Sequence, residues 1–322
     1  MSFALVLRVD ARGALVEIDG RTVAAQLRGA LFQEATWATR PVAVGDRVAL
    51  EGEGDELTIA RVEPRRSAFL RLAARGERKA QVIAANVDQV VAVASVGIPE
   101  FSSTFVDRML AGSAACEIPA AVILNKRDVA RPGAVDAILA TYARARVRAI
   151  AISAKTGEGL DEARALFAGK TSVLSGLSGT GKSSLLNALS PGLSRLVGHL
   201  SYKWKQGKHT TSAAELIHVA PGFDLIDTPG IRGFLPWGVD RRKLRHCFLD
   251  FEPLLGACRF ADCTHTNEPG CTLDEAVAAG TLARTRLASY REIFEELPPP
   301  PEEWSEGLRP RESGLGDDGS DE

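Results

Sequence analysis

A glycine-rich segment that begins at Gly176 constrains the fold of this chain more than any other part of its sequence. The segment reads Gly-Leu-Ser-Gly-Thr-Gly-Lys182-Ser183, follows the apolar run Thr171–Ser175 and leads into the helix-forming run Ser184–Leu189. A P-loop requires this strand–loop–helix context, because its glycines let successive backbone N–H groups surround an anion at the start of a helix. The spacing predicts that Lys182 neutralises phosphate oxygens and that the Ser183 hydroxyl binds Mg²⁺.

Apolar runs of strand length alternate with helical stretches before and after this point. The strand runs are Val87–Ala94, Ala120–Leu124, Val147–Ile152 and Thr171–Ser175, and the helical stretches are Ser103–Ala115, Ala134–Ala143 and Leu160–Ala168. This alternation predicts βαβ units and a mostly parallel sheet. Ligands of such sheets bind at the carboxyl ends of the strands, and the short polar motifs of this chain fall there.

The tetrapeptide Asn125–Asp128, which reads Asn-Lys-Arg-Asp, predicts a site for a guanine base. The Asp128 carboxylate can accept hydrogen bonds from N1–H and the N2 amino group of guanine. Adenine offers neither donor, so it would leave a desolvated carboxylate unpaired at a cost of about 1–3 kcal/mol or more. Lys126 is expected to cover the ring face, and Asn125 to tie this loop to the P-loop. The segment Ser153–Lys155 is expected to direct a backbone N–H near its middle residue at guanine O6.

Asp227-Thr-Pro-Gly230 follows the apolar run Phe223–Ile226 and is typical of the γ-phosphate side of such a site. Asp227 is placed to hold Mg²⁺ through water, and the Gly230 N–H to reach the γ-phosphate. Small GTPases commonly orient the attacking water with a glutamine just after such a motif. This chain has Ile231 there, so we expect slow intrinsic turnover.

The candidate for orienting water is His209, which precedes two threonines in Gly207-Lys-His-Thr-Thr211. The alternative is a surface histidine that only positions its loop. Thr210 or Thr211 is expected to contact Mg²⁺ and the γ-phosphate.

Three cysteines and a histidine crowd into fourteen residues as Cys258-x4-Cys263-x-His265-x5-Cys271. Three thiolates and one imidazole suit a closed tetrahedral Zn²⁺ site, so the sequence predicts one structural ion. We expect the ion to fold a loop of low apolar content. Helices are expected at Arg241–Leu249, Leu273–Ala279 and Leu282–Glu296.

The first 66 residues predict a small β-barrel. The expected strands are Ala4–Val9, Ala14–Ile18, Thr22–Gln26, Arg47–Leu50 and Leu57–Val62. Strand number favours an OB-fold, a scaffold often used on RNA, over an SH3-like barrel or a plain β-extension. The arginine-rich stretch 64–79 that follows is either a solvated surface or a patch that contacts phosphates.

The formal net charge of −2 conceals a mildly basic body and an acidic tail. Residues 297–322 hold eight acidic side chains and two arginines, which leaves the remainder of the chain at +4. The tail lacks the apolar surface to offset its ordering entropy, so we expect disorder there. No apolar run approaches the ~18 residues of a membrane span, and Phe3–Leu7 is too short for a signal-peptide core. We therefore expect a cytoplasmic protein without a membrane partner.

The order of the motifs is permuted. Ordinary GTPases place the P-loop first, whereas here the base motifs at 125 and 153 precede the phosphate motifs at 176 and 227. This order, together with Gly207–Thr211 and the Cys/His cluster, resembles the family of ribosome small-subunit-dependent GTPase A (RsgA, also called YjeQ), over essentially residues 4–296. Two positions depart from the family pattern, which commonly has Arg at Lys208 and a third threonine at Ser212.

The resemblance implies a circularly permuted P-loop GTPase domain between an N-terminal OB-type barrel and a mainly helical zinc domain. The implied domains are 1–70 (OB-fold, RNA-binding), 77–236 (GTP binding and hydrolysis), 237–296 (zinc) and 297–322 (acidic tail). It further implies GTP hydrolysis stimulated by the 30S subunit late in its maturation, contact with 16S rRNA and a cytoplasmic location. We expect GTP or GDP as ligand, no DNA partner and a monomer.

The candidate site residues fall into three groups. Those expected to bind GTP are Asn125, Lys126, Arg127, Asp128, Ser153, Ala154, Lys155, Gly176, Leu177, Ser178, Gly179, Thr180, Gly181, Lys182, Ser183, Ser184, Asp227 and Gly230. Those expected to act in hydrolysis are Lys182, His209 and Thr211. The expected metal ligands are Ser183 and Thr211 for Mg²⁺, and Cys258, Cys263, His265 and Cys271 for Zn²⁺.

Two other functions fit parts of the sequence. One is an RNA-binding scaffold whose nucleotide site is mainly structural or regulatory, which Ile231 makes conceivable. The other is an ATP-dependent kinase or ATPase, against which the Asn125–Asp128 motif argues.

Overall fold

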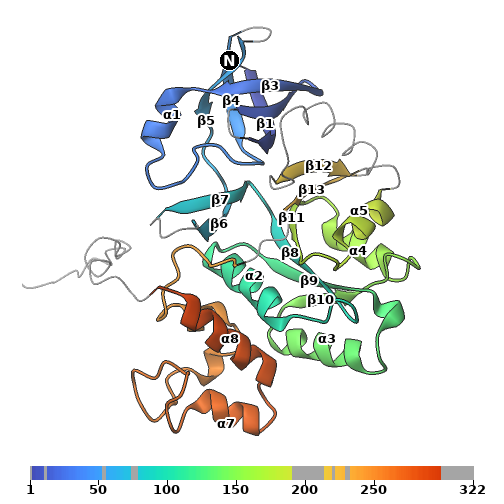
Figure 1. Ribbon diagram of the computed structural model, residues 1–322, viewed down its shortest axis with the longest axis vertical. Helices are drawn as coiled ribbons and strands as arrows, with labels where there is room; N and C mark the ends of the chain where they lie inside the picture. Colours follow the sequence, from blue (N-terminus) through green and yellow to red (C-terminus); the bar gives the residue numbers. More distant parts are fainter. Residues whose placement is uncertain are drawn as a thin grey trace, which may run out of the picture.

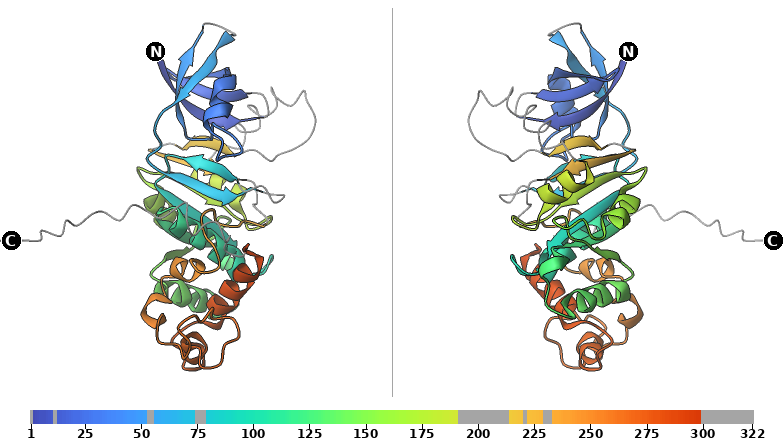
Figure 2. Two further views of the ribbon diagram at one scale, coloured as in Figure 1. Left: turned by 90° about the vertical axis from the view of Figure 1, so that its left-hand side faces the viewer. Right: turned by 90° about the vertical axis from the view of Figure 1, so that its right-hand side faces the viewer.

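The structure is a computed structural model of the chain, and it describes residues 2–10, 13–52, 56–73, 79–190, 214–219, 222–228 and 233–298. Three units are stacked along the long axis of the molecule (Figure 1), and the side views in Figure 2 show the same order. A β-barrel lies at one end, an α/β domain in the middle and a mainly helical module at the other end. The residues predicted to orient water or to contact the γ-phosphate, His209, Thr210, Thr211 and Gly230, lie outside the described residues, as does the tail beyond Pro298.

The N-terminal strands form a closed barrel. They are β1 (Ser2–Val9), β2 (Gly13–Ile18), β3 (Arg21–Leu27), β4 (Arg47–Glu51) and β5 (Thr58–Val62), with α1 (Gly29–Glu34) between β3 and β4. Neighbours follow the order β1-β2-β3-β5-β4, and β4 pairs back onto β1. Alternate side chains such as Val6, Val16, Val48 and Ile59 fill the interior, as a closed barrel requires. The five predicted strands and the OB-type Greek-key barrel are confirmed.

A hairpin that the sequence did not predict joins the barrel to the α/β domain. Its strands are β6 (Ala68–Leu72) and β7 (Ala80–Ala85). Arg65, just before β6, donates to both carboxylate oxygens of Asp46 at 2.7 and 2.8 Å. Asp46 is fully buried in the turn that precedes β4. Arg66 pairs with Asp88 at 2.6 Å. The basic stretch 64–79 therefore includes arginines that hold the two units together, a role that neither sequence interpretation anticipated.

The central domain contains a twisted sheet with the order β10-β9-β8-β11-β13-β12. Its strands are β8 (Gln89–Ser95), β9 (Ala120–Asn125), β10 (Arg148–Ala151), β11 (Thr171–Ser175), β12 (Glu215–Val219) and β13 (Phe223–Asp227). The pairings from β10 to β13 are parallel, whereas β12 runs antiparallel to β13. The parallel sheet and its strand positions are confirmed, and β12 is an addition to the prediction.

Helices cover both faces of this sheet. On one face lie α2 (Ser103–Ala115), which begins at the predicted residue, and α3 (Ala134–Arg144); on the other lie α4 (Leu160–Phe167) and α5 (Lys182–Leu189). Every side chain of β8 is buried, and alternate residues serve alternate faces: Val90 packs toward α2 and Val91 toward α4. The strand therefore reads as a continuous apolar run rather than an alternating one.

The C-terminal module packs on α2. It contains α7 (Thr272–Ala278), α8 (Arg284–Glu296) and two 3₁₀ turns, η3 (Leu244–Cys247) and η4 (Glu252–Leu254). The 3₁₀ turn η2 (Arg127–Val129) belongs to the central domain. The helix predicted at Arg241–Leu249 is wrong except for η3. The turn ends because Phe248 is extended and stacks on Phe251 at 4.9 Å between ring centroids. Core packing of this aromatic pair therefore outweighs helical propensity.

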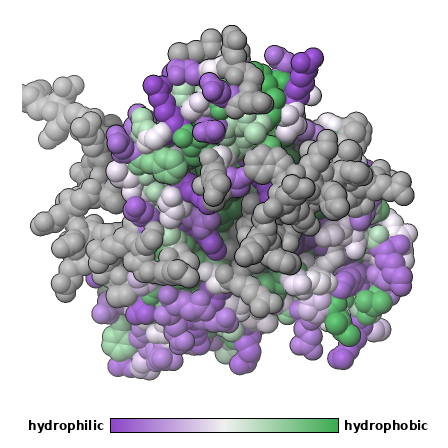
Figure 3. Space-filling view, turned by 45° about the horizontal axis from the view of Figure 1, so that its top comes forward, coloured by the Kyte–Doolittle hydropathy of each residue, from purple (hydrophilic) through white to green (hydrophobic). Residues whose placement is uncertain are grey.

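Among the described residues, no helix combines the length and apolar character that a membrane crossing needs. In Figure 3, hydrophilic side chains surround small hydrophobic patches on the described part of the face in view.

Candidate nucleotide site and metal centre

The predicted base loop and the predicted phosphate loop lie against each other. Asn125, at the end of β9, donates from Nδ2 to the Thr180 carbonyl oxygen at 3.0 Å. Lys126 donates from Nζ to the Gly179 carbonyl oxygen at 2.6 Å. Two segments about fifty residues apart in the chain thus meet at the carboxyl edge of the parallel sheet, because β8 alone separates their strands.

The base loop is held in a specific conformation. Lys126 adopts a left-handed backbone with φ of 68°, and the Asn125 side-chain oxygen accepts from the N–H groups of Lys126 at 2.8 Å and Ala154 at 3.0 Å. Ser153 is fully buried, and its hydroxyl donates to the exposed Asp128 carboxylate at 2.7 Å. The predicted base motifs at 125–128 and 153–155 therefore form one unit that presents an oriented carboxylate.

The glycines of the phosphate loop allow close backbone approach. Gly181 has φ of +89°, and a Cβ there would lie 2.3 Å from Asn125 Nδ2. A Cβ on Gly176 would lie 2.5 Å from the Val93 carbonyl oxygen in the neighbouring strand. The first turn of α5 then starts at Lys182, whose ammonium donates to the Gly176 carbonyl oxygen at 3.1 Å.

The carboxylate of Asp227 fits the role of a metal-binding group. It ends β13 beside the phosphate loop, and its Oδ1 atom is buried and has no hydrogen-bond partner among the described residues. Burial raises the pKa of Asp227, and the charge of Lys182 opposes that rise. A buried polar atom without a partner is costly, so a cation with its water shell is the kind of ligand that this position suits. Ser183 is exposed in the first turn of α5.

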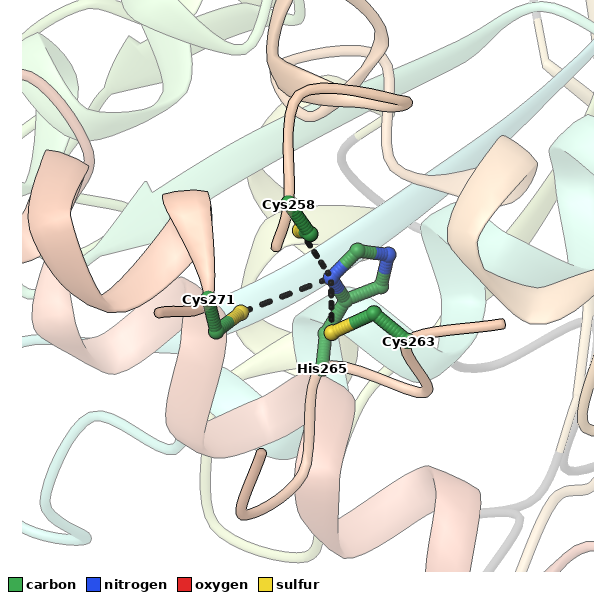
Figure 4. Close-up of side chains that lie close together, drawn as sticks. All are labelled: Cys258, Cys263, His265 and Cys271. Atoms are coloured by element: carbon green, nitrogen blue, oxygen red, sulfur yellow. Dashed lines mark hydrogen bonds between the residues drawn. The ribbon is translucent and has the colours of Figure 1, made fainter. Parts of the chain in front are cut away.

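Four side chains form a compact cluster in the C-terminal module (Figure 4). The Nδ1 atom of His265 lies 3.5 Å from each Sγ of Cys258, Cys263 and Cys271, and all four ligand atoms lie within 4.8 Å of one another. Ideal Zn–S and Zn–N bonds in a tetrahedron place S and N about 3.5–3.6 Å apart. The predicted ligands are thus brought together with the spacing of a tetrahedral metal site.

Surrounding hydrogen bonds fix the loops that carry these ligands. Glu268 accepts from the N–H and hydroxyl of Thr264; burial alone would raise the pKa of Glu268, but these hydrogen bonds lower it to about 2. Tyr290 and Arg291 of α8 donate to the carbonyl oxygens of Thr264 and His265. The cluster is therefore tied to α8, the helix that contacts the central domain.

Comparison with known proteins identifies the family. A family model described as RsgA GTPase matches residues 62–236. The chain is 40% identical to the small ribosomal subunit biogenesis GTPase RsgA of Azotobacter vinelandii, over 89% of this chain and 84% of the relative. It is 35% identical to the RsgA of Bacteroides fragilis, over 86% of this chain and 91% of that relative.

The chain belongs to the RsgA GTPase family. The crystal structure of YjeQ from Thermotoga maritima is similar to this one, with a TM-score of 0.69 and 30% identity over 92% of this chain and 98% of that chain. The predicted combination of N-terminal barrel, permuted GTPase domain and C-terminal Cys₃His module is thereby confirmed. Enzymes of the RsgA family are GTP hydrolases, as the family description states.

Sequence reasoning missed groups that shape the site in this RsgA family member. The Ile98 carbonyl oxygen accepts from Lys126 Nζ at 2.5 Å, and Pro99 lies against Gly179. Gly-Ile-Pro directly after the apolar run of β8, at the same sheet edge as the other motifs, is the signal that could have found them. Glu215 stands opposite Asp227 in the β12–β13 register and Arg8 of the barrel stands opposite Glu215; nothing in the sequence of β1 marks that juxtaposition.

Proposed function

We propose that the described loops bind GTP with Mg²⁺ and that the protein hydrolyses GTP during biogenesis of the small ribosomal subunit. The observation that carries the proposal is the pair of hydrogen bonds from Asn125 and Lys126 to the phosphate loop. They support the proposal because a guanine-type motif and a P-loop that contact each other can serve one nucleotide. Residues Gly176–Ser184 receive the phosphates, with Lys182 as the charge that neutralises them.

The Asp128 carboxylate selects guanine, and the stem of Lys126 covers the ring. Because the Ala154 N–H already donates to Asn125, we assign guanine O6 to the neighbouring N–H of Lys155. Arg127 supports the loop from outside, since its guanidinium donates to the Ala151 carbonyl oxygen and pairs with Glu158.

Magnesium is proposed to bind Ser183 and Thr211, with Asp227 acting through water. Mg²⁺ keeps several waters and neutralises phosphate charge. The chain contributes a hydroxyl and the buried Asp227 oxygen, which has no hydrogen-bond partner in the part of the chain that the structure describes. We propose that His209 orients the attacking water and Gly230 contacts the γ-phosphate, both on sequence grounds alone.

The decisive experiment measures GTP turnover with and without purified 30S subunits. We expect slow intrinsic turnover because Ile231 cannot orient water, and a marked acceleration by subunits. Fast turnover unchanged by 30S would contradict the proposal, and absence of single-turnover hydrolysis would favour a scaffold. GTP and ATP competition against labelled GDP separates a GTPase from an ATPase.

We propose that the protein is a cytoplasmic monomer that contacts 16S rRNA, without a DNA or membrane partner. The closed OB-type barrel supports the RNA contact, since such barrels commonly bind nucleic acid. Co-sedimentation with 30S, 50S and 70S particles, in GDP and in a non-hydrolysable GTP analogue, tests the partner; selective pelleting with 30S is expected.

We propose that the Cys₃His cluster holds structural Zn²⁺. Its soft donor set and closed geometry support zinc, because four protein ligands leave no open position for catalysis. Cys263→Ala is expected to abolish stoichiometric zinc and to raise hydrogen exchange in α7 and α8. Cys247→Ala is the matched control because Cys247 lies outside the cluster. Elemental analysis that finds no zinc in the well-ordered native protein would contradict the assignment.

A further inference from the structure

A pocket of about 290 Å³ opens at the seam between the α/β domain and the C-terminal module. Leu110 and Ala114 of α2, Val147 and the half-buried Cys247 line it, and Leu249 stands at its rim with 47% of its surface exposed. Small-molecule sites usually span about 300–1,000 Å³. The volume of this pocket, just below that range, suits a single large apolar side chain.

The rim of the pocket is basic on the side of the α/β domain. Arg146 lines the pocket, and Arg144, Arg146 and Arg148 are all exposed around the α3–β10 turn. Glu117 is an acidic neighbour on the loop after α2. The other lining guanidinium, Arg286, is neutralised by Asp107 and Asp250. An occupant with carboxylates beside an apolar group therefore matches the rim.

The acidic tail of this chain carries that combination. Trp304 is the lone aromatic residue of 297–322, and it lies between Glu302-Glu303 and Glu306. Leu297 is buried, and its carbonyl oxygen accepts from Arg241 at 3.0 Å, which fixes the point from which the tail departs.

The distances allow contact. Leu297 and the pocket residue Arg286 are eleven positions apart along α8, about 16 Å at the helical rise. The seven residues from Leu297 to Trp304 include Pro298–Pro301, and at the polyproline II rise of about 3.1 Å per residue they can span ~22 Å. Trp304 can therefore reach the pocket from its own chain.

We propose that Trp304 docks into this pocket, with the flanking glutamates facing the arginines of the α3–β10 turn. The docked tail bridges the two units across their seam and buries an apolar opening. A segment of the same chain needs no partner concentration, since its tether keeps the local concentration high.

Full-length protein labelled with 5-fluorotryptophan tests the proposal by ¹⁹F NMR, with the Trp304 resonance assigned from Trp304→Phe. We expect this resonance to be displaced from that of a free 297–312 peptide, and Arg146→Glu or Leu249→Ser to return it toward the peptide position. Arg21→Glu makes the same charge change on the barrel and should leave the Trp304 resonance where it is in the unmodified protein. GDP affinity and bound metal confirm that each variant is folded.

A Trp304 resonance at the free-peptide position in the unmodified protein would overturn the proposal. So would an equal response to Arg146→Glu and Arg21→Glu. A displacement that grows with protein concentration would place the tail on a second copy and overturn docking within one chain.

Discussion

Asp128 is oriented before any base arrives, because the buried Ser153 hydroxyl donates to its carboxylate at 2.7 Å. Replacing Asp128 by Ala removes the group that we propose pairs with two guanine donors. A lost pairing of this kind costs about 1–3 kcal/mol, so we expect GDP affinity to fall roughly 5- to 150-fold. Titration with a fluorescent GDP analogue measures the change. Asp136→Ala, an equal charge change on exposed α3 surface, should leave affinity unaltered; equal weakening by both variants would refute the assignment.

Side-chain motifs made much of this site predictable, and backbone contacts did not. Asn125 could be predicted to tie the two loops together because it belongs to the Asn-Lys-x-Asp tetrapeptide, which is defined by its side chains. The Ile98 carbonyl oxygen, which holds Lys126, could not be predicted, since any residue supplies a carbonyl. Glu215 escaped notice because it lies on β12, a strand that the sequence did not predict, and only the pairing of β12 with β13 brings it opposite Asp227.

Two helices, α2 and α8, connect the nucleotide-binding domain to the metal-binding module through buried charge. Arg286 of α8 pairs with Asp107 of α2 at 2.5 Å and with Asp250 at 2.7 Å, and Tyr142 donates to Asp107 at 3.0 Å. Asp107→Ala removes one of the two carboxylates that pair with the buried guanidinium and the acceptor of the Tyr142 hydroxyl. Breaking a buried pair costs about 3–5 kcal/mol, and because Asp250 remains, we expect a loss of about 3 kcal/mol in unfolding free energy. Glu292→Gln changes an exposed partner of Arg108 and should cost less than about 1 kcal/mol. Urea denaturation measures the unfolding free energy of both variants. Similar losses of unfolding free energy in the two variants would contradict a special role for the buried pair.

Elements with a strong apolar period could be predicted to the residue, whereas elements defined by their partners could not. The helix α2 and the strand β11 have the bounds that their sequences indicate. The hairpin strand β6 lies in an arginine-rich stretch, and it forms because β7 supplies its hydrogen bonds. Tertiary packing likewise shortened the expected helix at 241–249, where Phe248 turns into the core.

At the scale of the whole molecule, a histidine joins the barrel to the α/β domain. His218 of β12 is within 2.7 Å of Asp224 on β13 and within 3.0 Å of Glu17 on barrel strand β2. The hydrogen bond with Asp224 raises the pKa of His218 above its ordinary value, burial opposes the rise, and the charges of Asp224 and Glu17 add to it. The protonated ring thus bridges two carboxylates on different units.

The direction of this pKa shift determines how stability depends on pH. A group with a raised folded-state pKa stabilises fully below its unfolded value, about 6.5 for histidine, and loses that contribution as pH rises through the folded pKa. The urea midpoint of the unmodified protein should therefore fall more from pH 6 to pH 8.5 than that of His218→Gln. The effect should shrink in high salt because the ring is half exposed and its charge is screened. If the urea midpoints of the two proteins changed in parallel with pH, the charge of His218 would not stabilise the contact between the barrel and the α/β domain.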